Sequence, residues 1–204
     1  MDAQFWNQRY QEDGFAYGTE PNVFLKSNAK LLPPKARILC LAEGEGRNAI
    51  YLAEQQHQVT AIDYAAEGLS KLQQLAAERK LHIETVCADL ADYRLQAGAW
   101  DAIVCIFGHF PSDVRRHVFS QLHAALKPGG IFIMEAYAKD QLQYNTGGPK
   151  TEALLYSTED LKTDLAGFSK LNIHTGQKEL SEGSYHRGLS SVIDVIAVKD
   201  TTSA

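Results

Sequence analysis

The residues that point most directly to chemistry are Gly44 and Gly46, in the segment GEGRNA at residues 44–49. The segment fits the pattern G-x-G-x-x-G/A, follows an apolar strand-like run and opens a helical pattern, which is the context that a nucleotide-binding loop requires. Glycine has no Cβ, so the backbone of such a loop can approach a ligand closely. Asp63 ends the next strand-like run, where a carboxylate can accept hydrogen bonds from two ribose hydroxyls. Together these features favour a nucleoside site over a plain tight turn.

The glycine pattern alone is equally typical of NAD-binding proteins. A dehydrogenase needs a substrate domain or a Tyr-x-x-x-Lys catalytic pair, and none of the nine tyrosines has a lysine four positions later. A length of 204 residues suits one α/β domain and leaves no second one. An NAD(P)-dependent oxidoreductase therefore stays as an alternative, and a nucleoside-binding regulatory module without catalysis is another.

Short apolar runs alternate with longer helical patterns, and this alternation predicts parallel strands joined by helical crossovers. The segment KPGG at residues 127–130 is expected to end a helix, because proline cannot continue it and glycine permits the turn into a strand. We expect strands over residues 37–42, 58–63, 82–87, 101–106 and 131–136, with helices over about 47–55, 65–76 and 111–126.

The alternation changes after the fifth predicted strand. Residues 138–155 show no clear period and predict a loop that acts as a lid, and a helix is expected to start at 157–160. Two last strands are expected over 168–175 and 189–198, and the connection between them is too short for a helical crossover, so they should be antiparallel. The predicted fold class is α/β, a Rossmann-like three-layer sandwich with a mostly parallel seven-stranded sheet that ends in an antiparallel hairpin.

Composition narrows the choice of partners. A net charge of −5 and a pI near 5.8 argue against an electrostatic grip on nucleic acid. No stretch approaches the ~18 apolar residues of a membrane helix, and the first residues do not resemble a signal peptide. Cys40, Cys87 and Cys105 lie in apolar runs and are expected to be buried thiols, and no Cys/His spacing predicts a metal site. We expect a cytoplasmic monomer or homodimer that acts on a small molecule.

These landmarks resemble the class I methyltransferases, which use S-adenosylmethionine. The resemblance covers roughly residues 37–137 and adds Ala88-Asp89-Leu90 and LKPGG at residues 126–130 to the glycine loop and Asp63. The segments WNQRY at residues 6–10 and YGTEP at 17–21 are similar to a subgroup with tellurite-resistance and thiopurine methyltransferases.

The resemblance implies one methyltransferase domain over residues 1–204, in which residues 1–30 form a helical cap over the cofactor. Asp63 would hold the ribose diol, Tyr64 would cover the adenine, and Asp89 would accept a hydrogen bond from the adenine amine. The residues implied to bind the cofactor are Tyr17, Glu43, Gly44, Gly46, Arg47, Asn48, Asp63, Tyr64, Ala88, Asp89, Leu90, Ile106 and Phe107.

One departure from the family pattern concerns the methionine end of the cofactor. The family reads Asp-x-Gly-x-Gly-x-Gly, whereas this chain has Cys40, Ala42, Gly44 and Gly46 at the four motif positions. The acid that helps to orient the methionine amine is therefore missing from its usual place. We expect Glu43, three positions on, to supply that carboxylate, and the alternative is a purely structural Glu43.

The methyl acceptor is the part of the reaction that the sequence specifies least. The cofactor carries the reactivity, the protein holds the acceptor atom in line, and a general base is needed only when the acceptor must lose a proton. The family resemblance makes His109 and the pair His186-Arg187 catalytic candidates. The alternative for His109 is a histidine that only helps to start the next helix, and spacing alone would place the pair at an exposed hairpin tip. Arg47 either steers an anionic acceptor or pairs with a neighbouring carboxylate. We expect a small acceptor, with soft or anionic species (a thiol, tellurium or selenium species) as candidates.

The aromatic residues near the start of the chain have two interpretations. They form the wall of a pocket, or they dock an N-terminal helix on the core. These residues are Phe5, Trp6, Tyr10, Phe15 and Tyr17.

Overall fold

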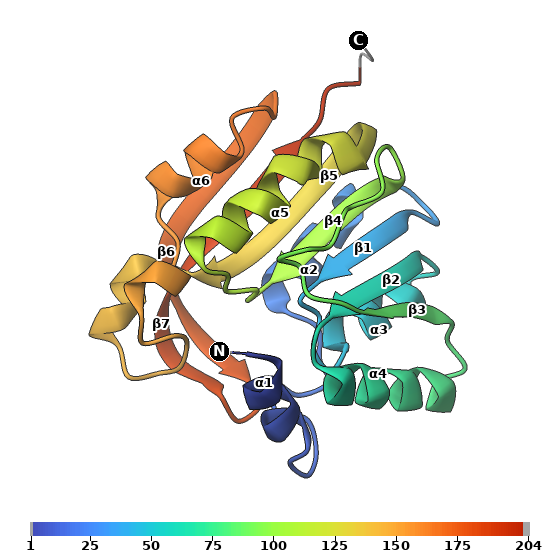
Figure 1. Cartoon of the computed structure of the whole chain (residues 1–204), viewed down its shortest axis with the longest axis vertical. Helices are drawn as coiled ribbons and strands as arrows, with labels where there is room; N and C mark the ends of the chain where they lie inside the picture. The colour runs from blue at the N-terminus through green and yellow to red at the C-terminus, as the bar shows by residue number, and fades with distance from the viewer. Residues whose placement is uncertain (1, 202–204) are drawn as a thin grey trace.

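A seven-stranded β-sheet forms the centre of the protein in the computed structural model, which describes residues 2–201. The strands lie in the order β3-β2-β1-β4-β5-β7-β6, with β1 to β5 parallel and β7 antiparallel to both of its neighbours (Figure 1). The predicted Rossmann-like sheet with an antiparallel hairpin is thereby confirmed. The strands are β1 (Arg37–Leu41), β2 (Gln58–Asp63), β3 (Ile83–Cys87), β4 (Trp100–Ile106), β5 (Leu126–Tyr137), β6 (Lys170–Glu182) and β7 (His186–Val198).

Helices cover both faces of the sheet and complete the three-layer sandwich (Figure 1). Leu39 and Leu41 of β1 pack in the core that contains α5 and α6, whereas Ile38 and Cys40 pack in the core under α3 and α4, because successive side chains of a strand point to opposite faces. Burial of both faces explains why residues 38–41 of β1 form a continuous apolar run. The helices are α1 (Ala3–Tyr10), α2 (Val23–Asn28), α3 (Arg47–Glu54), α4 (Ala66–Glu78), α5 (Ser112–Ala125) and α6 (Thr158–Asp164), with short 3₁₀ turns η1 (Ala29–Leu31), η2 (Lys139–Gln143) and η3 (Glu152–Leu154).

The segment Lys127–Gly130 ends α5, as predicted, but the strand that follows begins earlier than expected. β5 starts at Leu126, which pairs with Trp100, and the register then shifts so that Ile131 pairs with Ala102. The backbone N–H of Gly129 donates to Asp200, and the carbonyl of Gly130 accepts from Lys199. Hydrogen bonds to the two residues that follow β7 therefore hold this irregular segment beside the sheet.

The terminal hairpin is antiparallel, as predicted, but it is longer than predicted. Its ladder runs from Lys170 opposite Val198 to Glu182 opposite His186. The added residues are mostly polar and partly exposed, so their hydropathy resembles that of a loop although their backbone groups are paired across the hairpin. His186 consequently begins β7, and the turn comprises only residues 183–185.

The three cysteines are all unpaired thiols, and two of them are buried as expected. Cys40 and Cys105 lie inside the sheet, whereas Cys87 is exposed. Cys87 is the last residue of β3, and β3 is an edge strand, so the prediction of a buried thiol at this position is wrong. Among the described residues, no helix is long and apolar enough to cross a membrane.

Candidate cofactor and acceptor site

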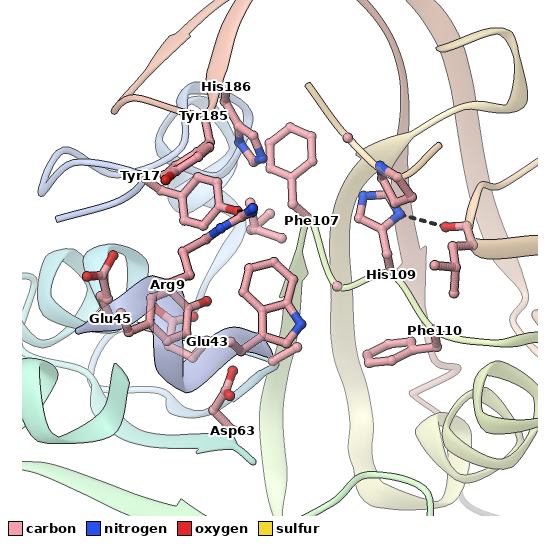
Figure 2. Close-up of a pocket in the computed structure, with 18 of the residues that line it drawn as sticks. Arg9, Tyr17, Glu43, Glu45, Asp63, Phe107, His109, Phe110, Tyr185 and His186 are labelled. Carbon is pink, nitrogen blue, oxygen red and sulfur yellow. Dashed lines mark hydrogen bonds between the residues drawn. The ribbon is translucent and has the colours of Figure 1, made fainter. Parts of the chain in front are cut away.

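A cavity of about 490 Å³ lies at the carboxyl ends of the parallel strands. Open α/β sheets bind ligands at this edge, because the loops that leave the strands converge there. The residues that follow β1 to β4 form its floor, and α1, the hairpin tip and residues 147–151 complete its walls. Figure 2 shows Asp63 at one end of this cavity, and His186 with Phe107 at the other.

The structure brings almost all of the predicted site residues to this cavity. The predicted cofactor residues line it except Gly44, and His109 and His186 line it as well. The exception among the catalytic candidates is Arg187, which is exposed and donates from Nε to the carbonyl of Gly183 at 2.5 Å. His186 and Arg187 are consecutive in a strand, so their side chains point to opposite faces.

Gly46 and Gly44 both have left-handed backbone angles, and each lies where a side chain would collide with a neighbour. Gly46 has a φ of +88° at the start of α3, and a Cβ there would lie 2.3 Å from Cδ1 of Leu72. A Cβ at Gly44 would lie 2.6 Å from the Tyr10 hydroxyl. The glycines therefore serve close packing of the loop against α4 and α1. Ala42, where the family has glycine, also adopts a left-handed φ of +51°.

The Glu43 carboxylate caps helix α3. Its Oε1 accepts hydrogen bonds from the backbone N–H groups of Asn48 at 3.0 Å and Ala49 at 2.7 Å. Burial raises the pKa of Glu43 to about 7, although the two N–H donors oppose that shift. Glu43 also lines the cavity, so it has the structural role that we held as the alternative and still faces the ligand space. Its contact with the methionine amine stays a prediction.

Asp63 is fixed by the backbone at the end of β2. Its Oδ1 accepts from the N–H of Ala65 and its Oδ2 accepts from the N–H of Gly44, both at 2.8 Å. Burial raises the pKa of Asp63, and the backbone donors oppose that effect. Each carboxylate oxygen has a further lone pair, so this orientation fits the two hydroxyls of a ribose.

Glu45 holds the N-terminal segment against the glycine loop. Its Oε2 accepts from the backbone N–H of Ala16 at 2.8 Å, and its Oε1 pairs with Lys71 at 2.9 Å. The segment that follows places Tyr17 in the cavity wall, beside Phe5, Trp6 and Tyr10, whereas Phe15 packs in the core under α3 and α4.

The sequence analysis missed Arg9, whose guanidinium reaches into the cavity (Figure 2). Its Cζ lies 4.2 Å from the ring centre of Tyr185 and 5.3 Å from that of Trp6, and its Nη1 donates to the Tyr17 hydroxyl at 3.1 Å. The only sequence signal was its place within the WNQRY segment, which gave the arginine no role of its own. Arg9 links α1 to the hairpin tip across the cavity.

His109 is held as a neutral imidazole with a defined tautomer. Its Nδ1 lies 2.7 Å from the carbonyl oxygen of Leu154, and a carbonyl only accepts, so Nδ1 carries the proton. Burial lowers the pKa of His109 to about 4. Its Nε2 is buried and has no hydrogen-bond partner within residues 2–201. His109 can therefore accept a hydrogen bond from a ligand.

His186 lies among aromatic rings and is buried, contrary to the exposed position that its spacing indicated. Its ring centre is 4.3 Å from that of Phe107 and 4.4 Å from that of Tyr17. Its Nδ1 lies 3.3 Å from Oε2 of Glu182, which also accepts from Nη2 of Arg47 at 2.7 Å. Burial alone would raise the pKa of Glu182, but His186 and Arg47 hold it at about 2.

Arg47 pairs with the carboxylate of Glu182, which agrees with one of the two interpretations of the sequence, but not all of its N–H donors are engaged. Its side chain is 8% exposed and its Nη1 has no hydrogen-bond partner in the described part of the chain. Because a buried guanidinium donor without a partner is costly, this atom fits an anionic group of a ligand in the cavity. Arg47 thus suits the carboxylate of an amino acid, and Asp63 suits the hydroxyls of a ribose. A nucleoside that carries an amino acid has both groups.

Comparisons with known proteins agree with this site. Residues 38–130 match a family model described as a methyltransferase domain. The chain is 28% identical over 166 residues to the thiopurine S-methyltransferase of Bordetella petrii, covering 70% of this chain and 74% of that protein. The TehB structure from Haemophilus influenzae superposes with a TM-score of 0.70 at 19% identity, covering 97% of this chain and 67% of that one.

A third comparison concerns the ligand. The magnesium protoporphyrin IX methyltransferase of Synechocystis PCC 6803, solved with bound S-adenosylhomocysteine, superposes with a TM-score of 0.63 at 17% identity, covering 97% of this chain and 83% of that one. The family model identifies a methyltransferase domain over residues 38–130, and the superposed structures share the fold of this chain. The protein is a methyltransferase enzyme.

The left-handed backbone of Ala42 generates a stability prediction. Replacing Ala42 with glycine removes the steric cost of a Cβ at positive φ, so the free energy of unfolding should rise by about 1 kcal/mol. Urea denaturation measures this change. Ala53→Gly, inside α3, is the matched control and should lower the free energy of unfolding by about 1 kcal/mol. A loss of stability in the Ala42→Gly variant would contradict the strained conformation.

The raised pKa of Glu43 generates a prediction on pH. If the ionised carboxylate receives the methionine ammonium, affinity for S-adenosylhomocysteine should increase about tenfold from pH 6 to pH 8, because a group with a pKa near 7 is mostly protonated at pH 6. The Glu43→Gln variant should bind more weakly at pH 8 and lose this pH dependence. Calorimetric titration at both pH values measures the effect, and equal affinities of the two proteins at pH 8 would leave Glu43 with its capping role alone.

Proposed function

We propose that this enzyme transfers the methyl group of S-adenosylmethionine to a small-molecule thiol, with aromatic thiols as the preferred class and soft tellurium or selenium species as the other candidates. The observation that carries the proposal is the character of the far end of the cavity. Phe107 and Tyr137 lie there with their ring centres 4.8 Å apart, beside the rings of His109 and His186. Aromatic faces suit a planar, polarisable acceptor.

The backbone conformation of Phe107 supports the proposal that this end of the cavity binds the acceptor. Phe107 has a left-handed φ of +53° at the end of β4, and its N–H donates to the carbonyl of Glu135 at 2.7 Å. Non-glycine residues adopt this conformation at a cost of roughly 1–3 kcal/mol, and such strain concentrates at functional sites. The conformation turns the Phe107 ring toward His186 and Tyr137, so it shapes the acceptor end.

The residues at the other end hold the cofactor. When bound, S-adenosylmethionine supplies an electrophilic methyl group on a sulfonium and leaves as S-adenosylhomocysteine. Asp63 would accept hydrogen bonds from the ribose hydroxyls, and Nη1 of Arg47 would donate to the methionine carboxylate. These contacts would hold the cofactor in a fixed position relative to the aromatic chamber and so align the two reactants.

The acceptor is enclosed by the N-terminal segment and the hairpin tip. The Tyr185 hydroxyl bonds to Glu12 at 2.8 Å, and the N–H of Ser184 donates to the carbonyl of Ala16 at 2.9 Å. Residues 147–151 line the remaining side, consistent with the lid expected for residues 138–155. A cavity with walls on these sides favours a small acceptor over a macromolecule.

An acceptor panel tests this proposal. With S-adenosylmethionine present, an aromatic thiol should be methylated with a kcat/KM at least about a hundredfold above that of the matching phenol, because sulfur is the softer nucleophile and an aromatic thiol loses its proton more readily than a phenol. The measurement is release of S-adenosylhomocysteine, with mass spectrometry of the methylated product. The panel includes a thiopurine, an aliphatic thiol, tellurite and selenite.

The proposal of a thiol acceptor fails if the phenol reacts as well as the thiol, and if tellurite or selenite reacts while no thiol does, the acceptor is the tellurium or selenium species instead. Arg47→Met is the control that ties turnover to this cavity. It should weaken binding of S-adenosylhomocysteine but not of methylthioadenosine, which lacks the amino-acid end.

A further inference from the structure

Glu182 is a buried carboxylate with three partners from three separate parts of the chain. It is the last residue of β6 and is 9% exposed. Its Oε2 accepts from Nη2 of Arg47 at 2.7 Å and lies 3.3 Å from Nδ1 of His186, while its Oε1 accepts from Nδ2 of Asn22 at 3.0 Å. Such a set of donors stabilises the ionised carboxylate, which can only accept hydrogen bonds.

Asn22 is itself immobilised, so it fixes the position of Glu182. Its side chain is fully buried and donates to both Glu182 and Glu135, the latter at 2.6 Å. Its Oδ1 accepts from the N–H of Leu25 and its own N–H donates to Asn48, at 3.0 and 2.9 Å. These four hydrogen bonds hold Asn22 and its side chain in one orientation. Glu182, which accepts from that side chain, therefore has little freedom to move away from His186.

The partner of Nδ1 decides which nitrogen of His186 carries the proton. A neutral imidazole has one donor and one acceptor nitrogen, and Glu182 requires a donor at Nδ1. Nε2 is then left with a free lone pair on the side of the ring away from Glu182. The ring lines the cavity between Phe107 and Tyr17 (Figure 2), so that lone pair is available to a molecule bound there.

We propose that Glu182 is a positioning residue that fixes His186 in its Nδ1–H tautomer, so that Nε2 accepts the proton of a thiol acceptor during methyl transfer. This inference rests on the proposed function. The acceptor sulfur forms a bond to the methyl carbon as the bond between that carbon and the sulfonium breaks, and the S–H proton passes to Nε2. The imidazolium is stabilised by the Glu182 carboxylate and then releases its proton to solvent.

The charges that face His186 are consistent with this role. Glu182 of β6 favours the imidazolium, whereas Arg47 of α3 and Arg9 of α1 oppose it, and His109 beyond Phe107 is neutral. Burial together with the arginines lowers the pKa of His186 despite Glu182. The imidazole is therefore unprotonated near neutral pH and can accept a proton.

Kinetics with two thiols of different acidity distinguish a positioning role of Glu182 from a purely structural role. Glu182→Gln should lower kcat at least about tenfold for a weakly acidic thiol, which must lose its proton to His186, but should leave kcat within about twofold for a nitrothiophenol, which is ionised in solution already. A structural defect would slow both thiols equally. Glu182→Asp keeps the charge and should recover part of the lost rate. Glu179→Gln, at an exposed position of the same strand, is the matched control and should change neither rate.

Nitrogen NMR of His186 tests the tautomer without any acceptor. At pH 8 the wild-type protein should show a protonated Nδ1 and an unprotonated Nε2, and Glu182→Gln should show Nε2 protonation, because a glutamine amide can donate to Nδ1. A protonated Nε2 in the wild type would overturn the inference, as would equal losses of kcat for the two thiols. If no thiol is methylated, the proposed function fails and the proton transfer with it, while the NMR result still decides whether Glu182 sets the tautomer.

Discussion

The compensation of buried negative charge is the physical constraint on which the site depends. Glu43, Glu45, Asp63, Glu135 and Glu182 are all at least nine-tenths buried, and each has a hydrogen-bond donor that opposes the cost of burial. Removing one partner of a buried ion pair costs about 3–5 kcal/mol, because the remaining charge is left without compensation. The segments that supply these donors are therefore held in place by the same carboxylates that form the site.

This constraint explains how distant parts of the chain converge on one cavity. Glu43 and Asp63 fix the glycine loop through backbone N–H groups, and Glu45 fixes the N-terminal segment through Ala16 and Lys71. Lys178 of β6 pairs with Glu135 and with Asp194, which ties β6 to its neighbour β7 and to β5 on the other side of β7. The parallel sheet supplies the edge where the loops meet, and the ionic contacts decide which side chains face the ligand.

The fold and the cofactor end follow from local sequence signals. Apolar runs of strand length predicted the order of the elements, and Gly44, Gly46 and Asp63 marked the loop and the acidic strand end. Those signals can be read locally, because a glycine turn and a strand terminus leave a recognisable pattern in consecutive residues even though Gly44 and Gly46 also serve packing against α1 and α4. Burial of Cys87 was predicted wrongly, because a run of apolar residues does not reveal which strand lies at the edge of the sheet.

The acceptor end depends on contacts that no local pattern contains. Asn22 and Glu182 are 160 positions apart in the sequence, and Arg47 and Glu182 are 135 apart. The spacing around His186 indicated an exposed tip, because the polar residues before it concealed the continuing strand. Its burial arises from packing against Phe107 and Tyr17, which come from β4's end and the N-terminal segment. Arg187 is directed outward by the same strand geometry that directs His186 inward.

A crystal structure with S-adenosylhomocysteine is the most direct test of the central claim that one cavity joins a cofactor end at Asp63 to an acceptor end at His186. The account predicts ribose hydroxyls on the Asp63 carboxylate, the methionine carboxylate within hydrogen-bond distance of Nη1 of Arg47, and the sulfur directed toward Phe107 and His186. A nucleoside bound away from Asp63, or a sulfur directed away from the aromatic chamber with Nη1 of Arg47 still unpaired, would contradict it.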